Sequence, residues 1–417
     1  MLEQMVRDIA KKAREASFYL ANVSTERKNE ALNIAAQLID EKRREINEAN
    51  KEDVKEAEQE GVSKAFIDRL TLTEKRINGM IKSLKEVSVL EDPVGTIIRG
   101  WKRPNGLQIL QMRVPIGVIG IIYESRPNVT VEASSLCLKA GNATILRGGK
   151  EAINSNRILY GILNEAVKKA GLPEGCIGFI DSVDRKAIKY LIRMNGLVNL
   201  IIPRGGEGLI NFVTENATVP VIKHYKGLCH TYVDEFASLS MAQEIVYNAK
   251  VQRPGVCNAI ETLLVHKNIA GKFLPKMVRK LQEAGVEVRG CERTKKIISQ
   301  IKEAEAEDWD TEYLDLILSI KVVDDMDEAI GHINKHGSQH SEAIITENYE
   351  RAMEFLYRVD AATVYVNSST RFTDGGEFGM GAEIGISTDK IHARGPMGLP
   401  ELTIYKYVIL GSGQIRK

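Results

Sequence analysis

Two observations in the sequence predict an α/β protein built around two parallel sheets. Short runs rich in Val and Ile alternate with helix-compatible stretches between residues 115 and 203, and a second such series follows Val251. Continuous apolar strands separated by helices are typical of parallel sheets that are buried on both faces. The chain has 417 residues, more than one hydrophobic core usually holds, so two or three domains are expected.

The N-terminal region, residues 1–90, is predicted to be helical. It is rich in Ala, Glu, Lys, Arg, Leu and Ile, and its apolar residues recur at helical spacing. Ser24, Asn50 and Thr73 each precede a charged, helix-favouring stretch, so each is predicted to cap a helix N-terminus. Gly61 is predicted to end a helix.

The predicted strands after this region form two series. The first comprises residues 118–123, 143–146, 177–180 and 200–203. The second comprises residues 260–265, 286–288, 316–323, 343–346 and 363–367. Residues 97–113 and 402–410 alternate apolar and polar side chains instead, which predicts one small antiparallel unit.

These patterns divide the chain into four predicted parts. One α/β domain takes residues 1–96 and 114–227, and a second takes residues 228–367. Residues 97–113 and 395–417 form the antiparallel flap, and residues 368–394 form a returning segment that lines the cleft.

Charge and composition exclude several classes of protein. Lys and Arg number 57 against 56 Asp and Glu, so there is no overall field to hold nucleic acid or an anionic membrane. The longest apolar runs reach roughly ten residues, well short of the roughly 20 that span a bilayer. The N-terminus is a charged amphipathic run, not a secretory core. We expect a cytoplasmic protein with neither nucleic acid nor membrane as a partner.

The five cysteines are scattered and never form CxxC, which predicts reduced thiols, not a disulfide framework or a zinc site. Cys257 lies in a polar loop, Gln252 to Asn258, just before a predicted strand. The neighbouring Arg253 and a Pro-Gly turn favour a thiolate there. Because most cysteines are small buried hydrophobes, the local sequence leaves a structural role open as well.

Other motifs point less clearly to chemistry. The turn of Arg204, Gly205 and Gly206 follows a strand and precedes a helical stretch, so its N–H groups face an anion or simply form a βα turn. Residues 376–385 depart from the dinucleotide fingerprint because the third glycine comes one position late. His332, His336 and His340 are four apart, but a glycine after the second predicts the helix end, so no metal site is expected.

Five motifs, in register along nearly the whole chain, resemble the aldehyde dehydrogenase superfamily. They are residues 115–120, 140–150, 171–173, the Cys257 loop and residues 364–367. The resemblance implies a cofactor domain, a catalytic domain with Cys257 as nucleophile, and a flap that joins copies of the chain into a dimer or tetramer.

The resemblance also implies a nicotinamide cofactor, and one departure indicates which. Where the superfamily has Lys-Pro-Ser-Glu at the adenosine ribose, this chain has Arg147-Gly148-Gly149-Lys150. Arg147 and Lys150 could bind a 2′-phosphate that a carboxylate would repel, so we expect NADPH. By the same alignment Arg204, Gly205 and Gly206 face the pyrophosphate, and Glu312 the nicotinamide ribose.

Two further departures concern the mechanism. The superfamily's water-activating glutamate, in Glu-Leu-Gly-Gly, is replaced by residues 223–227, Lys-His-Tyr-Lys-Gly, which favours reduction of a thioester over its hydrolysis. The oxyanion-hole asparagine aligns with Ser125. The expected oxyanion donors are therefore the Cys257 N–H with Ser125 or Asn128.

The reaction that the resemblance implies is NADPH-dependent reduction of L-glutamate 5-phosphate to L-glutamate 5-semialdehyde. Arg126, Arg253 and Arg394 are candidates to bind this anionic substrate, with surface salt bridges as the alternative. Two other functions remain open: a superfamily oxidoreductase with a different acyl donor or aldehyde, and a non-enzymatic scaffold.

Overall fold

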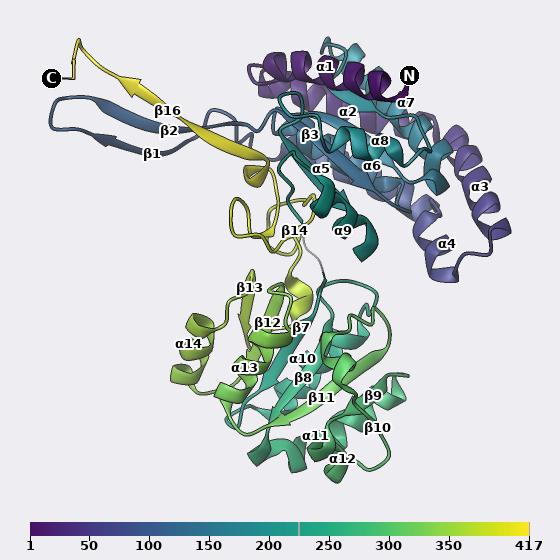
Figure 1. The fold of residues 1–417 in the computed structure, drawn as a ribbon, viewed down its shortest axis with the longest axis vertical. Coiled ribbons are helices and arrows are strands. Elements are labelled where there is room, and N and C mark those ends of the chain that lie inside the picture. Colours follow the sequence, from purple (N-terminus) through teal and green to yellow (C-terminus); the bar gives the residue numbers. More distant parts are fainter. Residues whose placement is uncertain (224–225, 417) are drawn as a thin grey trace. The chain divides into compact units, whose positions relative to one another are not determined.

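The computed structural model describes residues 1–223 and 226–416, without the side chains of residues 64 and 65. Its contacts divide the chain into two compact units (Figure 1). Unit 1 comprises Met1–Lys223, Gly379–Gly385 and Met397–Lys417, and unit 2 comprises His224–Phe378 and Ile386–Pro396. Residues 368–394, expected to form one returning segment, are divided between the two units.

Unit 1 contains a four-stranded parallel sheet in the order β5-β4-β3-β6. Its strands are β3 (Val118–Tyr123), β4 (Ala143–Gly148), β5 (Ile177–Phe179) and β6 (Leu200–Arg204). The associated helices are α6 (Asn128–Lys139), η1 (Lys150–Ala152), α7 (Ile153–Lys169), α8 (Lys186–Leu191) and α9 (Glu207–Asn216). Every residue of β3 and β4 is buried, so both faces of the sheet are covered, as the apolar runs predicted.

The strand order of this sheet reverses beside β3. The chain passes from β3 to β4 and β5 on one side, and then returns to β6 on the other side of β3. In open α/β sheets, ligands bind outside the carboxyl ends of the strands at such a reversal. The carboxyl ends of β3 and β6 are therefore the place in unit 1 to look for a bound molecule.

The N-terminal helices are α1 (Leu2–Leu20), α2 (Thr25–Glu41), α3 (Arg43–Gln59), α4 (Lys64–Leu70) and α5 (Glu74–Val89). Ser24 and Thr73 cap α2 and α5 as predicted, since each side chain accepts an N–H of the first turn. The prediction for Asn50 is wrong, because this residue lies inside α3. Its buried amide donates to the Leu70 carbonyl, so a tertiary contact and not a helix start explains it.

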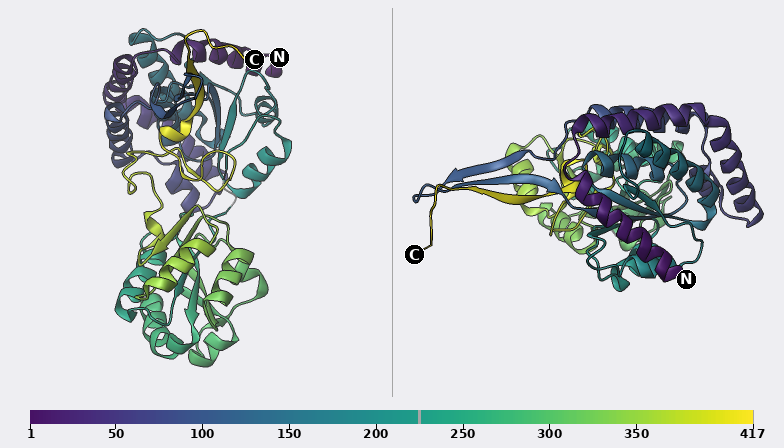
Figure 2. Two further views of the ribbon diagram at one scale, coloured as in Figure 1. Left: turned by 90° about the vertical axis from the view of Figure 1, so that its left-hand side faces the viewer. Right: turned by 90° about the horizontal axis from the view of Figure 1, so that it is seen from above.

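The flap is a three-stranded antiparallel sheet in the order β1-β2-β16, which confirms the small antiparallel unit. Its strands are β1 (Ile97–Lys102), β2 (Gln108–Pro115) and β16 (Thr403–Leu410), and η4 (Pro400–Leu402) precedes the last. Figures 1 and 2 show these strands extending away from the helices of unit 1. Exposed apolar side chains cover β16 and the start of β1: Ile97, Ile98, Ile404, Tyr405, Tyr407, Ile409 and Leu410.

Unit 2 contains a seven-stranded parallel sheet in the order β10-β9-β11-β8-β7-β12-β13. Its strands are β7 (Cys229–Val233), β8 (Ile260–His266), β9 (Glu287–Gly290), β10 (Lys302–Glu303), β11 (Ile317–Val323), β12 (Ser341–Ile345) and β13 (Thr363–Val366). Its helices are α10 (Leu239–Val251), α11 (Lys267–Glu283), α12 (Glu292–Ile297), η2 (Ala306–Asp310), α13 (Met326–His336), α14 (Tyr349–Arg358) and η3 (Thr370–Phe372). A short antiparallel pair, β14 (Ile386–Ser387) and β15 (Gly395–Pro396), completes the unit.

The prediction that the second series begins after Val251 is wrong, because β7 precedes it and pairs with both β8 and β12. All five residues of β7 are buried. Three of them are Cys229, His230 and Thr231, so the strand lacks the Val and Ile run by which the others are recognised.

Candidate active site

Exposure distinguishes the five thiols. All are free; Cys137, Cys176 and Cys229 are buried, whereas Cys257 and Cys291 are half-buried. Burial raises the pKa of Cys137 and of Cys176 to about 12, so these thiols are inert near neutral pH. Cys291 lies at the start of α12, where its sulfur contacts the Thr294 hydroxyl. Cys257 occupies the loop before β8, as expected, with its side chain partly accessible.

The residue after Cys257 fastens this loop to η3. The side-chain nitrogen of Asn258 donates to the Thr373 carbonyl at 2.9 Å, and its side-chain oxygen accepts from Arg371. The Thr370 hydroxyl donates to the Asn258 carbonyl at 2.6 Å. Only 5% of Asn258 is exposed, so these bonds form away from water and hold the loop in one position.

A second set of contacts supports Cys257 from the chain just before β7. A Cβ added at Gly227 would overlap the Cys257 carbonyl oxygen and lie 2.5 Å from its Cα. The Cys229 thiol donates to the same carbonyl at 3.2 Å. The Glu312 carboxylate accepts the Gly227 N–H at 2.9 Å. Glu312, predicted to face the nicotinamide ribose, therefore lies next to the segment on which Cys257 rests.

A buried ion pair joins the two elements that flank the Cys257 loop. Lys250, in the last turn of α10, lies 2.6 Å from Glu261, the second residue of β8, and both side chains are at most 1% exposed. Burial lowers the pKa of Lys250 and raises that of Glu261 to about 7. Removing one partner would leave an unpaired buried charge, which typically costs about 3–5 kcal/mol. The pair thus fixes both ends of the loop.

Two arginines place positive charge near Cys257. Burial lowers the pKa of Arg371, the neighbouring Arg253 lowers it further, and the Cys257 thiol raises it. Arg253 was predicted from the sequence, whereas Arg371 was missed. Arg394, the other candidate in this unit, lies 2.8 Å from Asp360 in an ion pair, so its charge is partly neutralised within the chain.

Of the candidate oxyanion residues in unit 1, Ser125 lies in the turn between β3 and α6, and Asn128 is the first residue of α6. Ser125 has a φ of 49°, an uncommon conformation outside glycine, and its N–H and hydroxyl donate to Glu151 at 2.7 and 3.1 Å. The Asn128 amide donates to Glu132 at 2.8 Å. Arg126 is exposed between them. These residues follow the carboxyl end of β3, beside the reversal in strand order.

The other side of this reversal is a turn that accepts an anion. The Gly206 N–H donates to the Glu124 carboxylate at 3.0 Å at the start of α9. A Cβ at Gly205 would overlap the same carboxylate, so a larger residue there would have to push the Glu124 side chain aside. A cradle of this kind suits the diphosphate of a dinucleotide, which binds helix N-termini for the same electrostatic reason. The turn of Arg204, Gly205 and Gly206 therefore stays a candidate for binding the pyrophosphate.

Arg147 lies near the end of β4 and Lys150 follows that strand, and the two differ in their surroundings. Arg147 is 5% exposed, and its Nη2 donates to the Val183 carbonyl at 3.3 Å. Burial lowers its pKa, and its Nε has no hydrogen-bond partner in the described part of the chain. Lys150 is exposed and pairs with Glu60 at 2.8 Å. A buried guanidinium with a spare donor fits a phosphate group, whereas Lys150 would have to leave its present partner.

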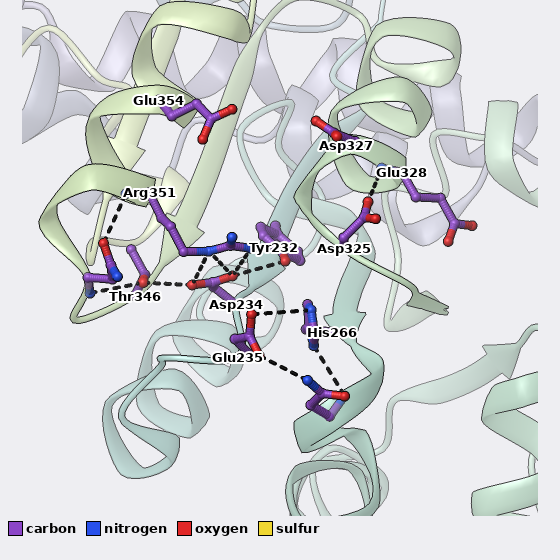
Figure 3. A network of polar contacts seen from close by, with 12 residues as sticks. Tyr232, Asp234, Glu235, His266, Asp325, Asp327, Glu328, Thr346, Arg351 and Glu354 are labelled. Carbon is purple, nitrogen blue, oxygen red and sulfur yellow. Dashed lines mark hydrogen bonds and ion pairs between the residues drawn. The ribbon is translucent and has the colours of Figure 1, made fainter.

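The end of the unit 2 sheet opposite the Cys257 loop is closed by polar contacts (Figure 3). Asp234, fully buried after β7, binds Arg351 of α14 through Nε at 2.8 and 2.9 Å and accepts from Thr346 at 2.8 Å. Beside it Glu235 lies 3.7 Å from His266. The ion pair therefore fills the carboxyl end of β7 and β12, where this sheet reverses its order.

Two of the three histidines, His332 and His336, share a helix face, with ring centroids 4.6 Å apart, whereas His340 does not. His332 and His336 lie on α13, which ends at His336 as predicted, while His340 is buried just before β12. In residues 1–223 and 226–416 no group of three or more His, Cys, Asp or Glu side chains could hold a metal ion. Over the same residues, no helix is long and apolar enough to cross a bilayer.

Comparison with known proteins gives concordant results. The aldehyde dehydrogenase family model matches residues 2–312 and 297–383. A gamma-glutamyl phosphate reductase of Caldanaerobacter subterraneus subsp. tengcongensis is 62% identical over 98% of this chain and 99% of its own. One from Thermodesulfovibrio yellowstonii is 57% identical over the whole of both chains.

Solved structures show the same fold. The crystal structure of gamma-glutamyl phosphate reductase from Thermotoga maritima superposes with a TM-score of 0.97 at 54% identity, covering 99% of this chain and 100% of the other. An acetylating aldehyde dehydrogenase from Geobacillus thermoglucosidasius, at 19% identity, has a TM-score of 0.71 over 100% and 98% of the two chains. The chain therefore belongs to the aldehyde dehydrogenase family, among the members named gamma-glutamyl phosphate reductases.

Proposed function

We propose that this protein reduces L-glutamate 5-phosphate to L-glutamate 5-semialdehyde and phosphate with NADPH, the second step of proline biosynthesis from glutamate. The full-length relatives at 55–62% identity support the reaction. The observation that carries it is Cys257, a half-buried thiol on a loop held by Asn258 and Gly227. A fixed nucleophile of this kind is what acyl transfer requires.

In the proposed mechanism the Cys257 thiolate attacks the γ-carbonyl carbon of the substrate. The tetrahedral adduct expels phosphate and leaves a thioester on Cys257. A nicotinamide cofactor, which Arg147 and the turn of residues 204–206 would hold, would supply the hydride that reduces the thioester carbon. The resulting thiohemiacetal releases the aldehyde and restores the thiolate, so Cys257 is unchanged over the cycle.

Water must not compete with hydride for the thioester. Residues 223–227 stand where hydrolytic members of the family carry the activating glutamate, and the stretch contains no Glu or Asp. Two of these residues, 224 and 225, lie outside the described part of the chain. Without a general base at this position the thioester is expected to outlast the hydride step.

Charge on the tetrahedral adduct needs hydrogen-bond donors. We assign the Cys257 N–H together with Ser125 or Asn128, whose side chains donate to Glu151 and Glu132 in this structure. Such a donor typically contributes about 10²–10³ in rate. For the anionic ends of the substrate we assign Arg126 and Arg253, which are exposed, ahead of Arg394, which pairs with Asp360.

The reverse reaction tests the proposal. With 1-pyrroline-5-carboxylate, the cyclised form of the aldehyde, the purified protein should reduce NADP⁺ only when inorganic phosphate is present. Phosphate is required because it must displace Cys257 from the thioester. Reduction of NADP⁺ without phosphate, or with coenzyme A in its place, would instead favour a different acyl donor.

The cofactor preference is expected to depend on Arg147. Membership of the family indicates a nicotinamide cofactor, and we propose NADPH with Arg147 and Lys150 at its 2′-phosphate. Arg147→Ala should reduce the ratio of kcat/KM for NADPH over NADH by roughly 10- to 100-fold, as expected for losing a charge-assisted bond. Arg193→Ala, which removes an exposed arginine of the same unit, is the control. Equal efficiency of the unmodified enzyme with both cofactors would contradict the assignment.

We also propose that the flap joins copies of the chain into a dimer or tetramer. Contiguous exposed apolar side chains on a monomer usually mark an interface, and β16 carries five of them, from Ile404 to Leu410. Ile409→Asp should shift the mass found by light scattering toward the 46.4 kDa monomer, whereas Lys406→Ala should not.

Because Cys257 acts as a free thiol, we place the enzyme in the reducing cytoplasm.

A further inference from the structure

Arg371 connects both ends of the loop that carries Cys257. Its Nε donates to the Gln252 side-chain oxygen at 2.9 Å, and its Nη1 donates to the side-chain oxygen of Asn258. Gln252 opens the loop and Asn258 follows Cys257 directly. One guanidinium therefore spans the segment on which the thiol lies.

The backbone of η3 reinforces this arrangement. The Asn258 amide donates to the Arg371 carbonyl at 3.4 Å as well as to that of Thr373. The Ser369 hydroxyl accepts the Arg371 N–H at 3.3 Å. The planar guanidinium is thus fixed in position, which favours two directed hydrogen bonds in a way that a lysine cannot reproduce.

These two hydrogen bonds use Nε and Nη1 of Arg371 and leave its Nη2 nitrogen unused. In the described residues its Nη2 has no hydrogen-bond partner, and no carboxylate forms an ion pair with the guanidinium. Burial and the nearby Arg253 lower the pKa of Arg371, and the Cys257 thiol opposes that shift. The guanidinium bonds to the side chain next to Cys257, and a cation beside a thiol favours its thiolate form.

The acidic side chains and the histidine near the Cys257 loop each make a contact with another group. Glu312 accepts the Gly227 N–H, Glu261 pairs with Lys250, and His340 contacts the Cys229 sulfur. Asp374 acts on Arg371 from the end of η3. Among the described residues, Arg253 lies within the loop, Arg371 is bonded to it, and Lys226 precedes the Gly227 that packs against Cys257.

We propose that Arg371 is a positioning residue that holds the Cys257 loop through Gln252 and Asn258 and stabilises Cys257 as a thiolate. The role of Cys257 as nucleophile rests on the proposed function, whereas the ionisation of its thiol can be measured without that function. Only the thiolate reacts with alkylating reagents. Alkylation therefore tests Arg371 without substrate, and its outcome is separate from whether the protein reduces an acyl phosphate.

The experiment follows iodoacetamide labelling of the Cys257 peptide by mass spectrometry, because Cys291 is also half-buried. Arg371→Gln should slow labelling at pH 7 about tenfold, with a smaller difference at pH 9.5 where more of any thiol ionises. Arg371→Lys keeps the charge and should label within about threefold of the unmodified protein. It should still lose kcat with little change in KM, since the loop is no longer held. Arg358→Gln, an exposed arginine of α14, is the matched control.

A purely structural role predicts the opposite result. A loosened loop would expose the thiol, so labelling of Arg371→Gln at or above the unmodified rate would overturn the proposal. Equal slowing in Arg371→Gln and Arg371→Lys would do the same, because charge would not be the cause. If Arg371→Gln does not fold, the charge around Cys257 can still be tested on the unmodified protein. The ratio of iodoacetate to iodoacetamide rates at Cys257 should exceed that of glutathione, and a ratio at or below it would overturn the proposal.

Discussion

Cys257→Ala is expected to abolish phosphate-dependent reduction of NADP⁺, by at least about 10⁴-fold in kcat, as loss of a covalent nucleophile does elsewhere. The thioester cannot form without this sulfur, and the buried thiols Cys137, Cys176 and Cys229 cannot replace it. The measurement is the initial rate of NADPH formation from 1-pyrroline-5-carboxylate and phosphate.

Two controls accompany this variant. Cys291→Ala removes the other half-buried thiol and should retain full activity, so reactivity is assigned to position and not to exposure. Cys257→Ala should bind NADPH as the unmodified protein does, because the candidate cofactor residues Arg147 and Arg204 belong to unit 1. Activity above about one per cent in Cys257→Ala would remove the basis of the proposed mechanism.

The strands that could be predicted from the sequence are those in which tertiary burial and local composition agree. β3 is apolar along its length, β8 contains the apolar run of residues 263–265, and both strands are buried throughout. β7 is equally buried, but its His230 and Thr231 bury polar atoms that only the folded unit accommodates. The His230 N–H and ring, for example, both contact Glu342 at 2.9 Å. Such a contact, 112 residues away along the chain, leaves no trace in local periodicity.

The candidate site divides in the same way. Cys257 and Arg253 could be identified because a thiol, an arginine and a Pro-Gly turn are adjacent in the sequence. Arg371 could not, because it meets Asn258 across 113 residues. In the sequence Arg371 follows the polar residues Ser368, Ser369 and Thr370, and a cation next to that polar run was the available signal. Residue type therefore indicates the candidate nucleophile, while the residues that hold its loop follow from the fold.

Gly227→Ala is expected to lower kcat roughly 10²-fold, because misplacing a catalytic group by about 1 Å has an effect of that size. The new methyl group would overlap the Cys257 carbonyl oxygen, and backbone cannot move aside as a flexible side chain can. Either the Cys257 loop or the segment before β7 must shift. Overpacking of this kind typically costs about 1–3 kcal/mol as well, so the unfolding temperature should fall.

The control for this substitution is Gly331→Ala in α13 of the same unit, where an added Cβ meets nothing within 4 Å. That variant should keep its activity and gain about 0.5–1 kcal/mol, since alanine favours a helix over glycine. Comparing the two separates the cost of a methyl group from the cost of moving Cys257. If Gly227→Ala lost stability but kept kcat, the position of the loop would not limit the reaction. The contacts of Gly227 and Asn258 with the loop would then serve folding alone.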